Sequence, residues 1–334
     1  MPRSLLTALG LLPLALLPAP TRSPVTVVVE YEIPRDNSFP HDPAVGSDGI
    51  LWYTDQSNSM IGRLDPATGT ITDYPTPTPK SGPHGLVVAA DGGVWYTAQR
   101  IGALGRLDPA SGRIEEYPLP SEARNPHTPL VHQGMIWFTD ANNNSYGRLD
   151  PATGKAEVWI APTPRSIPYG LAAAPDGSLW IAQLGSNQLG RVDPATGLMQ
   201  EFVLPNPAAR PRRLAVAANG TVWYTDNARG FLGALDPATG AVREWPSPSG
   251  NAEPYGIAIG TDGRIWYNEA TSGLMVAFDP KTEKMETVKI PTPGKYAHRR
   301  RQPSTTPDTA FIWLLTLPPP KAFMAAGITI LTIP

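Results

Sequence analysis

A repeat of about 43 residues organises most of this 334-residue chain. Tryptophan recurs at positions 52, 95, 137, 180, 223 and 266, and an Asp-Pro pair follows in phase at positions 65, 108, 150, 193, 236 and 279. Five of these pairs continue as Asp-Pro-Ala-(Thr/Ser)-Gly, and the sixth reads Asp-Pro-Lys-Thr-Glu. A period of this length, built from short alternating segments, is typical of the blades of a β-propeller.

Each repeat is predicted to form a blade of four short strands. In the second repeat the strands are expected at 85–90, 93–97, 104–107 and 113–117. Asp-Gly separates the first two strands and Asp-Pro-Ala-Ser-Gly the last two, with glycine where a turn needs positive φ. The tryptophan of each second strand is expected to pack between blades, and the aspartate of each Asp-Pro pair to stabilise its turn. The 40 prolines and 31 glycines fit this turn-rich all-β class.

A seventh blade is predicted from the two ends of the chain. Residues 27–34 end in Glu-Tyr-Glu-Ile-Pro and match a fourth strand such as 114–120, but no first three strands precede them. The C-terminal segment 295–334 is about long enough to supply these strands. The expected fold is therefore a seven-bladed propeller of four-stranded antiparallel blades, with no exposed sheet edges.

The segment 295–334 departs from the repeat. It contains a basic run and a Ser/Thr/Pro-rich stretch, and Trp313 follows Trp266 by 47 residues rather than 43. Neither turn motif returns. Two interpretations stay open: a divergent closing blade, or a shifted reading frame near residue 295, which would leave the ring poorly closed and the tail disordered.

The first 23 residues are predicted to be a secretory signal peptide. Arg3 supplies the positive charge, 5–17 the apolar stretch and 19–23 a small-residue exit. A membrane anchor is the alternative, but about 13 apolar residues interrupted by Pro13 are too few to span a bilayer. The chain is thus divided into a signal at 1–23, a propeller at 24–294 and the divergent segment. The mature protein is expected in the periplasm or outside the cell, without membrane insertion.

Composition excludes several classes of function. The chain has no cysteine, which rules out disulfides, thiol nucleophiles and Cys-ligated zinc. Its net charge of −2 gives no reason to expect nucleic acid or an anionic membrane surface as a partner. A closed propeller buries its own sheet edges, so a monomer is expected.

Two positions change from repeat to repeat while the scaffold around them does not. The residue after the proline that begins each first strand is His41, His84, His127, Tyr169, Arg212 or Tyr255. The third residue after each tryptophan is Asp55, Ala98, Asp140, Gln183, Asp226 or Glu269. Because first and second strands run antiparallel, both sets are expected at one end of the central channel. Convergent polar groups there indicate a binding or catalytic site. The alternative is that they cap strands, bridge blades and bind water.

The last repeat places two carboxylates at the ends of one hairpin. Its strands are expected at 257–260 and 264–267, around a Thr-Asp-Gly turn. Glu253 and Glu269 flank this hairpin, so they are predicted to lie on the same side of the sheet and to share a cation. Carboxylate oxygens are the ligands that a hard cation such as Mg²⁺ prefers.

The repeat motifs resemble those of the streptogramin B lyases, also called virginiamycin B lyases. The shared pieces are Pro-His-Gly, Asp-Gly-x-x-Trp-(Tyr/Phe)-Thr, (Leu/Ile)-Gly-Arg-Leu-Asp-Pro and Glu-Tyr-x-(Leu/Ile)-Pro, and they cover about residues 28–294. The resemblance implies a seven-bladed propeller that opens a cyclic depsipeptide antibiotic by Mg²⁺-dependent elimination.

The resemblance also implies site residues. Glu253 and Glu269 correspond to the metal-associated carboxylates of the family, whereas the two family histidines fall at Arg212 and Tyr255. Elimination needs a base for the proton beside a carbonyl, a task for which histidine is suited near neutral pH. In this chain the base would be an activated Tyr255 or His127 across the ring, with Arg212 orienting the substrate.

Three functions follow as hypotheses. The first is a Mg²⁺-dependent carbon–oxygen lyase acting on a small cyclic ester, whose remaining substrate contacts would be His41, His84, Tyr169, Asp140 and Asp226. The second, ranked lower, is a lactonase-type hydrolase. The third is a non-catalytic module that binds a small molecule or peptide, which the replacement of both family histidines favours.

Overall fold

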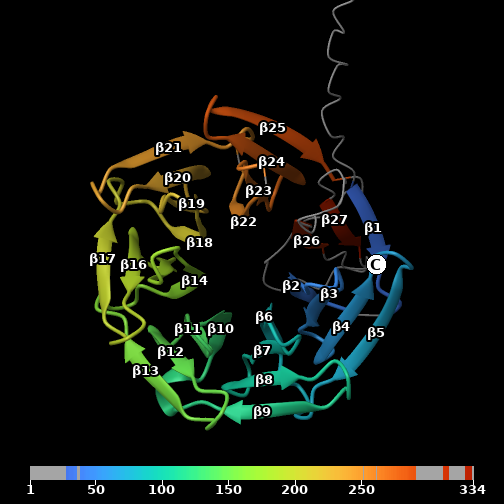
Figure 1. Cartoon of the computed structure of the whole chain (residues 1–334). Coiled ribbons are helices and arrows are strands. Elements are labelled where there is room, and N and C mark those ends of the chain that lie inside the picture. Colours follow the sequence, from blue (N-terminus) through green and yellow to red (C-terminus); the bar gives the residue numbers. More distant parts are fainter. Residues whose placement is uncertain are drawn as a thin grey trace, which may run out of the picture.

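The computed structural model describes residues 28–35, 38–250, 252–260, 262–290, 311–315 and 328–332. The predicted signal peptide and most of 295–334 lie outside the described residues. Six four-stranded antiparallel sheets are arranged as blades around a central channel, with the first strand of each blade innermost (Figure 1). No described helix is long and apolar enough to cross a membrane.

The first three blades follow one another along the chain. Blade 1 consists of β2 (Pro40–Val45), β3 (Leu51–Asp55), β4 (Met60–Asp65) and β5 (Thr70–Pro75). Blade 2 consists of β6 (Pro83–Val88), β7 (Val94–Ala98), β8 (Ala103–Leu107) and β9 (Ile114–Pro118). After the short 3₁₀ helix η1 (Ser121–Ala123), blade 3 consists of β10 (Pro126–His132), β11 (Met135–Asp140), β12 (Ser145–Leu149) and β13 (Ala156–Ile160).

The next three blades repeat the same order. Blade 4 consists of β14 (Pro168–Ala173), β15 (Leu179–Gln183), β16 (Gln188–Val192) and β17 (Met199–Val203). Blade 5 consists of β18 (Pro211–Val216), β19 (Val222–Asp226), β20 (Phe231–Leu235) and β21 (Val242–Pro246). Blade 6 consists of β22 (Pro254–Ile259), β23 (Ile265–Glu269), β24 (Leu274–Asp279) and β25 (Lys284–Lys289).

The prediction of a seventh four-stranded antiparallel blade is wrong for the described residues. The remaining sheet has three strands in the order β1 (Val28–Glu32), β27 (Ile328–Thr332) and β26 (Phe311–Leu315). Its β1 pairs in parallel with β27, whereas β27 pairs antiparallel with β26. Segment 295–334 lacks the turn motifs that join consecutive strands in the other blades, so its described strands do not repeat their order. Closure of the ring by this sheet stays a prediction.

The second-strand tryptophans pack between blades, as predicted. Trp52 lies in one buried cluster with Leu86 and Tyr96 of the next blade. Trp137 likewise shares a cluster with Leu179 and Ile181 of blade 4. Five of the six tryptophans thus join the core of one blade to that of the next, which is why the repeat encodes a ring.

The Asp-Pro turns are also as predicted. In blade 3 the side chain of Asp150 accepts hydrogen bonds from Ala152 N at 2.9 Å and from Thr153 Oγ1 at 2.8 Å. Gly154 N bonds back to the Asp150 carbonyl at 2.8 Å, with Gly154 at a φ of 68°. In blade 6 this last position is Glu283, which adopts a φ of 56° that glycine would reach with less strain.

Candidate functional site

The residues after the first-strand prolines form a row around the channel, and its first half is a stack of imidazoles. His84 lies between two others, with its ring centroid 3.7 Å from that of His41 and 4.1 Å from that of His127. The row continues to Tyr169, whose ring centroid is 3.8 Å from that of His127. Each residue is the second of its blade's innermost strand, so the repeat itself places them side by side.

The second half of the row is an arginine held between two tyrosines. The Arg212 guanidinium carbon lies 5.3 Å from the ring centroid of Tyr169 and 4.1 Å from that of Tyr255. Arg212 Nη2 donates to the Tyr169 hydroxyl at 3.3 Å, and the two tyrosine hydroxyls are also 3.3 Å apart. The structure thus brings together all six predicted residues of this set.

The next residue along the strand forms a clasp across the channel. Arg213 Nη2 donates to both oxygens of Asp42, at 3.1 and 3.0 Å, and its Nη1 donates to Thr128 Oγ1 at 3.2 Å. These three residues come from blades 1, 3 and 5, and we call them the Asp42–Thr128–Arg213 clasp. The matching residue in blades 2, 4 and 6 is glycine. A Cβ at Gly85 would lie only 2.2 Å from the His127 carbonyl oxygen. Blade 2 therefore has no room for a side chain at this position, whereas blades 1, 3 and 5 have one.

The clasp is a strong ion pair. Burial by itself would raise the pKa of Asp42, but Arg213 and His41 outweigh it and hold that pKa well below its usual value of 3.8. Burial would likewise lower the pKa of Arg213, but Asp42 outweighs it and raises that pKa. His41 Nδ1 lies 2.9 Å from Asp42 Oδ1, which connects the clasp to the row of imidazoles.

A threonine hydroxyl of the preceding blade fixes four of the six row residues. Thr139 Oγ1 donates to the Tyr169 carbonyl at 2.7 Å and accepts from Thr128 N at 3.3 Å. The pairing of β10 with β11 is irregular between Pro126 and Pro129. The Thr139 hydroxyl therefore accepts from the backbone N–H of Thr128, which strand pairing leaves without a partner. Equivalent hydroxyls are found on Thr54, Thr97 and Thr225. Blade 4 has Ala182 at this position, so no such hydroxyl reaches the carbonyl of Arg212.

The second predicted set lies at the same end of the hairpins as the row, since Pro126 pairs with Asp140 and Pro211 with Asp226, but its carboxylates bond to loop groups. Asp140 is buried and accepts from the backbone N–H groups of Asn125, Asn142 and Asn143 at 2.6 to 3.1 Å. Asp226 in blade 5 accepts in the same way from Arg210 N at 3.0 Å. These side chains stabilise the loops at the two ends of their hairpins, as the alternative interpretation held.

Glu253 and Glu269 lie at the predicted end of their hairpin but in different environments. Pro254 pairs with Glu269, which confirms the expected register. Glu253 is exposed and adopts a φ of 42°. Glu269 is completely buried and accepts from Ser249 N at 3.3 Å and from the hydroxyls of Ser249 and Ser272.

The donor set at these two glutamates does not fit Mg²⁺ as it stands. That ion requires near-octahedral oxygen ligands. Both oxygens of Glu269 are already hydrogen-bonded, and no third acidic or imidazole ligand joins the two glutamates among the described residues. Oε2 already has two hydroxyl donors, so a cation here would bind through Oε1, beside the Ser249 N–H, or replace a serine donor.

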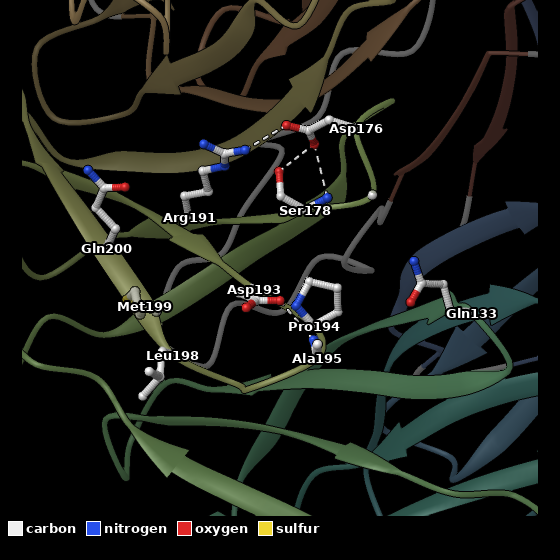
Figure 2. Close-up of a pocket in the computed structure, with 11 residues that line it drawn as sticks. Gln133, Asp176, Ser178, Arg191, Asp193, Pro194, Ala195, Leu198, Met199 and Gln200 are labelled. Carbon is white, nitrogen blue, oxygen red and sulfur yellow. Dashed lines mark hydrogen bonds and ion pairs between the residues drawn. The ribbon is translucent and has the colours of Figure 1, made fainter.

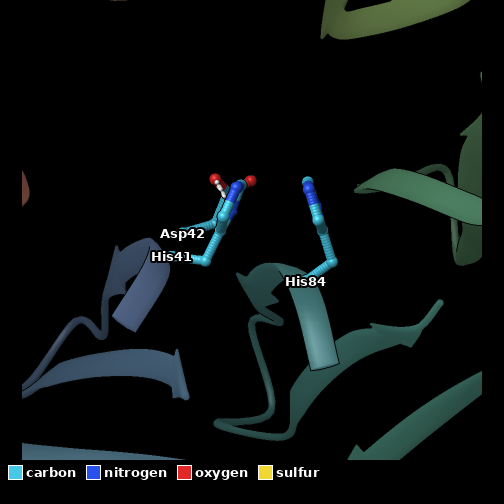
Figure 3. Close-up of side chains that lie close together, drawn as sticks. All are labelled: His41, Asp42 and His84. Carbon is cyan, nitrogen blue, oxygen red and sulfur yellow. Dashed lines mark ion pairs between the residues drawn. The ribbon is translucent and has the colours of Figure 1, made fainter. Parts of the chain in front are cut away.

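A different group of potential metal ligands lies within the row. In the described part of the chain, ligand atoms of His41, Asp42 and His84 lie within 4.8 Å of one another (Figure 3). Two imidazoles and a carboxylate are typical of zinc and other divalent transition ions. Both oxygens of Asp42, however, accept from Arg213. A metal would have to displace that guanidinium, so this group is an ion-pair network rather than a metal centre.

The surface hollow of blade 4 contains none of the predicted residues. It lies at turns of that blade beside Gln133 of blade 3 (Figure 2). Its charges pair with each other, since Arg191 Nη2 contacts Asp176 at 2.7 Å, while Asp193 accepts from its own turn. A second hollow is formed by the corresponding turns of blade 6. Such hollows belong to the repeat scaffold.

Sequence reasoning missed the clasp and the threonines. Arg213 and Asp42 are 171 positions apart, and only the closed ring brings them together. The sequence does contain a sign of the clasp. Blades 2, 4 and 6 have glycine after the row residue, whereas blades 1, 3 and 5 have Asp42, Thr128 and Arg213 there. A second sign is a threonine two residues after the tryptophan in four blades, at Thr54, Thr97, Thr139 and Thr225.

Comparisons with known proteins agree with this geometry. The sequence model of the Virginiamycin B lyase family matches residues 22–133 and 129–302. Virginiamycin B lyase from Staphylococcus aureus is 27% identical, with a TM-score of 0.74 over 78% of this chain and 88% of that one. A streptogramin B lyase structure is also 27% identical, with a TM-score of 0.74 over 79% and 87%.

A third solved structure is a catalytically inactive His-to-Ala variant of the Staphylococcus aureus enzyme with quinupristin. It is 31% identical, with a TM-score of 0.67 over 72% of this chain and 80% of that one. No curated protein matches. The family match extends through all six blades, and the chain therefore belongs to the virginiamycin B lyase family.

Proposed function

We propose that this protein binds a small molecule at the mouth of the channel and does not open it by elimination. The observation that carries the proposal is the contact between Arg212 and Tyr255 at the two positions where the resemblance places histidines. The guanidinium carbon lies 4.1 Å from the centroid of the Tyr255 ring. An arginine stays protonated in proteins and cannot remove a proton, so one of the two positions is lost to base catalysis.

The other candidate bases are occupied by structural contacts. The Tyr255 hydroxyl contacts the Tyr169 hydroxyl at 3.3 Å and accepts from Arg213 at 3.5 Å. His127 Nδ1 lies 2.9 Å from Thr128 Oγ1. Burial raises the pKa of Tyr169, which keeps that phenol protonated near neutral pH. These contacts support recognition of a ligand rather than proton transfer.

The competing candidate is the carbon–oxygen lyase reaction. It is supported by family membership and by the presence of both Glu253 and Glu269. It requires Glu269 to bind Mg²⁺ while its carboxylate also accepts from Ser249 and Ser272. No observation favours a lactonase-type hydrolase.

Incubation with quinupristin and Mg²⁺, followed by chromatography and mass spectrometry, tests the proposal. We expect intact quinupristin, with the Staphylococcus aureus enzyme run beside it as the positive control. Calorimetry should then detect saturable quinupristin binding that Tyr255→Ala weakens. A product of unchanged mass but altered retention would establish elimination and overturn the proposal, and a product heavier by one water would indicate hydrolysis.

Mg²⁺ titration by calorimetry separates the two candidates independently of turnover. We expect no saturable binding, because no third acidic or imidazole ligand joins Glu253 and Glu269 among the described residues. Saturable binding that Glu269→Gln abolishes, with the fold unchanged by circular dichroism, would favour the lyase.

A further inference from the structure

Arg212 is a cation without an acidic partner in the described part of the chain. Its neighbour Arg213 is neutralised by both oxygens of Asp42. No described carboxylate lies within ion-pair distance of Arg212. The clasp and Arg212 together therefore leave one positive charge at the channel.

The guanidinium of Arg212 also has donors to spare. It carries five N–H groups, and Nη2 donates to the Tyr169 hydroxyl at 3.3 Å. Its Nε–H is buried and has no acceptor among the described residues. A buried donor without an acceptor costs free energy, so the described residues leave this guanidinium incompletely satisfied.

The two tyrosines determine how the guanidinium is presented. Tyr169 and Tyr255 contact it through their ring faces, at 5.3 and 4.1 Å. Cation–π contacts of this kind hold the planar group while its N–H edge stays able to bind two oxygens of one anion. The Tyr169 hydroxyl lies beside it and is paired with the Tyr255 hydroxyl.

We propose that the ligand of the channel mouth carries an oxyanion, a carboxylate or a phosphate, and that Arg212 binds it through its guanidinium edge. This inference rests on the binding function proposed above and names the chemical class of the ligand. Lysine would supply only the charge at this position, whereas arginine supplies a planar fork that matches a carboxylate or phosphate.

The test is calorimetric titration of the full chain with inorganic phosphate and with citrate at constant ionic strength, with glycerol as the uncharged probe. We expect saturable binding of at least one anion, weakened about tenfold or more by Arg212→Gln. Arg212→Lys should fall in between. Arg100→Gln, at an exposed arginine in blade 2, is the matched control and should bind like the wild type. Preference between the two anions identifies a phosphate or a carboxylate ligand.

Two results would overturn the inference. One is the absence of saturable phosphate and citrate binding to the wild type, and the other is equal affinity in the wild type and Arg212→Gln, with native circular dichroism for both. The result is separable from that of the proposed function. Opening of quinupristin would disprove the non-catalytic function but would leave an Arg212-dependent anion site in place. Intact quinupristin without anion binding would disprove only the anion site.

Discussion

At the scale of single residues, the channel is dominated by two adjacent arginines with different environments. Arg213 belongs to the clasp and is neutralised by Asp42, whereas Arg212 lies between two aromatic rings without an acidic partner among the described residues. Adjacent residues of a strand point to opposite sides, and the irregular pairing between Pro211 and Leu214 modifies this alternation so that both reach the channel. One arginine thus stabilises the ring, and the other is available for a ligand.

Removing the acidic partner of the clasp should destabilise the fold. Asp42→Asn leaves the Arg213 guanidinium without its ion pair, at a site where the two side chains are 15% and 14% exposed. Loss of one partner of a buried pair costs about 3 kcal/mol, toward the lower end of the range because some exposure remains. Urea unfolding at pH 7 measures the difference, and Ser111→Ala in an exposed turn provides a control expected to change little.

The same pair predicts a pH dependence. Because the pKa of Asp42 is depressed in the folded state, its stabilisation is fully present above the unfolded pKa of about 3.9. It decreases as the pH falls below that value toward the folded pKa. His41, His84 and Arg213 face this carboxyl, so the comparison is made between pH 5 and pH 3, below the range in which ordinary histidines titrate. A stability difference between wild type and Asp42→Asn that is as large at pH 3 as at pH 5 would contradict the assignment.

Restoring the family histidines tests the role of the row. Arg212→His with Tyr255→His places imidazoles at both positions that the resemblance assigns to them. We expect the double variant to gain measurable quinupristin opening in the presence of Mg²⁺, because the two imidazoles would supply both a base and the further ligand that Glu253 and Glu269 lack among the described residues. Each single variant is the control, and we expect little activity in either. A double variant that folds but stays inactive would indicate that the missing histidines are not the reason for the absence of turnover.

At the scale of elements, the inner hairpins are joined by hydroxyl groups rather than by backbone pairing. Thr54, Thr97, Thr139 and Thr225 each donate to the carbonyl of the row residue in the next blade. Each therefore couples the position of one blade to that of its neighbour. The contact is buried, so its loss leaves a carbonyl without a donor.

Replacing one of these hydroxyls should lower the free energy of unfolding more than replacing the hydroxyl of an exposed threonine. Thr139→Val keeps the shape but removes the bonds to the Tyr169 carbonyl and to Thr128 N. We expect a loss of about 1–3 kcal/mol, since both backbone groups would be left unpaired in the interior. Thr239→Val, in the exposed Asp236 turn, is the matched control and should stay within about 0.5 kcal/mol. Equal effects in thermal unfolding would mean that the inter-blade bond contributes little.

At the scale of the whole molecule, the two ends of the chain meet in one sheet. Strand β1 pairs with β27, so the N-terminal strand depends on residues 300 positions away. Deleting residues 295–334 removes both β26 and β27 and leaves the edge of β1 unpaired. We expect the thermal unfolding midpoint to fall by several degrees, and limited proteolysis to begin within 28–35. An unchanged midpoint would show that this sheet does not close the ring.

Much of the fold could be predicted because the same pattern of strands and turns recurs in six repeats. In blade 2 the strands expected at 85–90, 93–97, 104–107 and 113–117 are observed at Pro83–Val88, Val94–Ala98, Ala103–Leu107 and Ile114–Pro118. Alternating burial and glycine-containing turns are local features, and they recur in phase with each tryptophan. The seventh blade could not be predicted in the same way, since segment 295–334 lacks those features.

The sequence by itself determined the class of fold, the phase of the strands and the six residues of the channel row, because these depend on contacts within a blade or between consecutive blades. Only the tertiary structure decided what the polar groups do. Asp140 and Glu269 accept hydrogen bonds from nearby loop groups, whereas Asp42 pairs with Arg213 across the channel. The physical reason is that a ring closes over long separations in sequence, so pairing across its centre has no local signal.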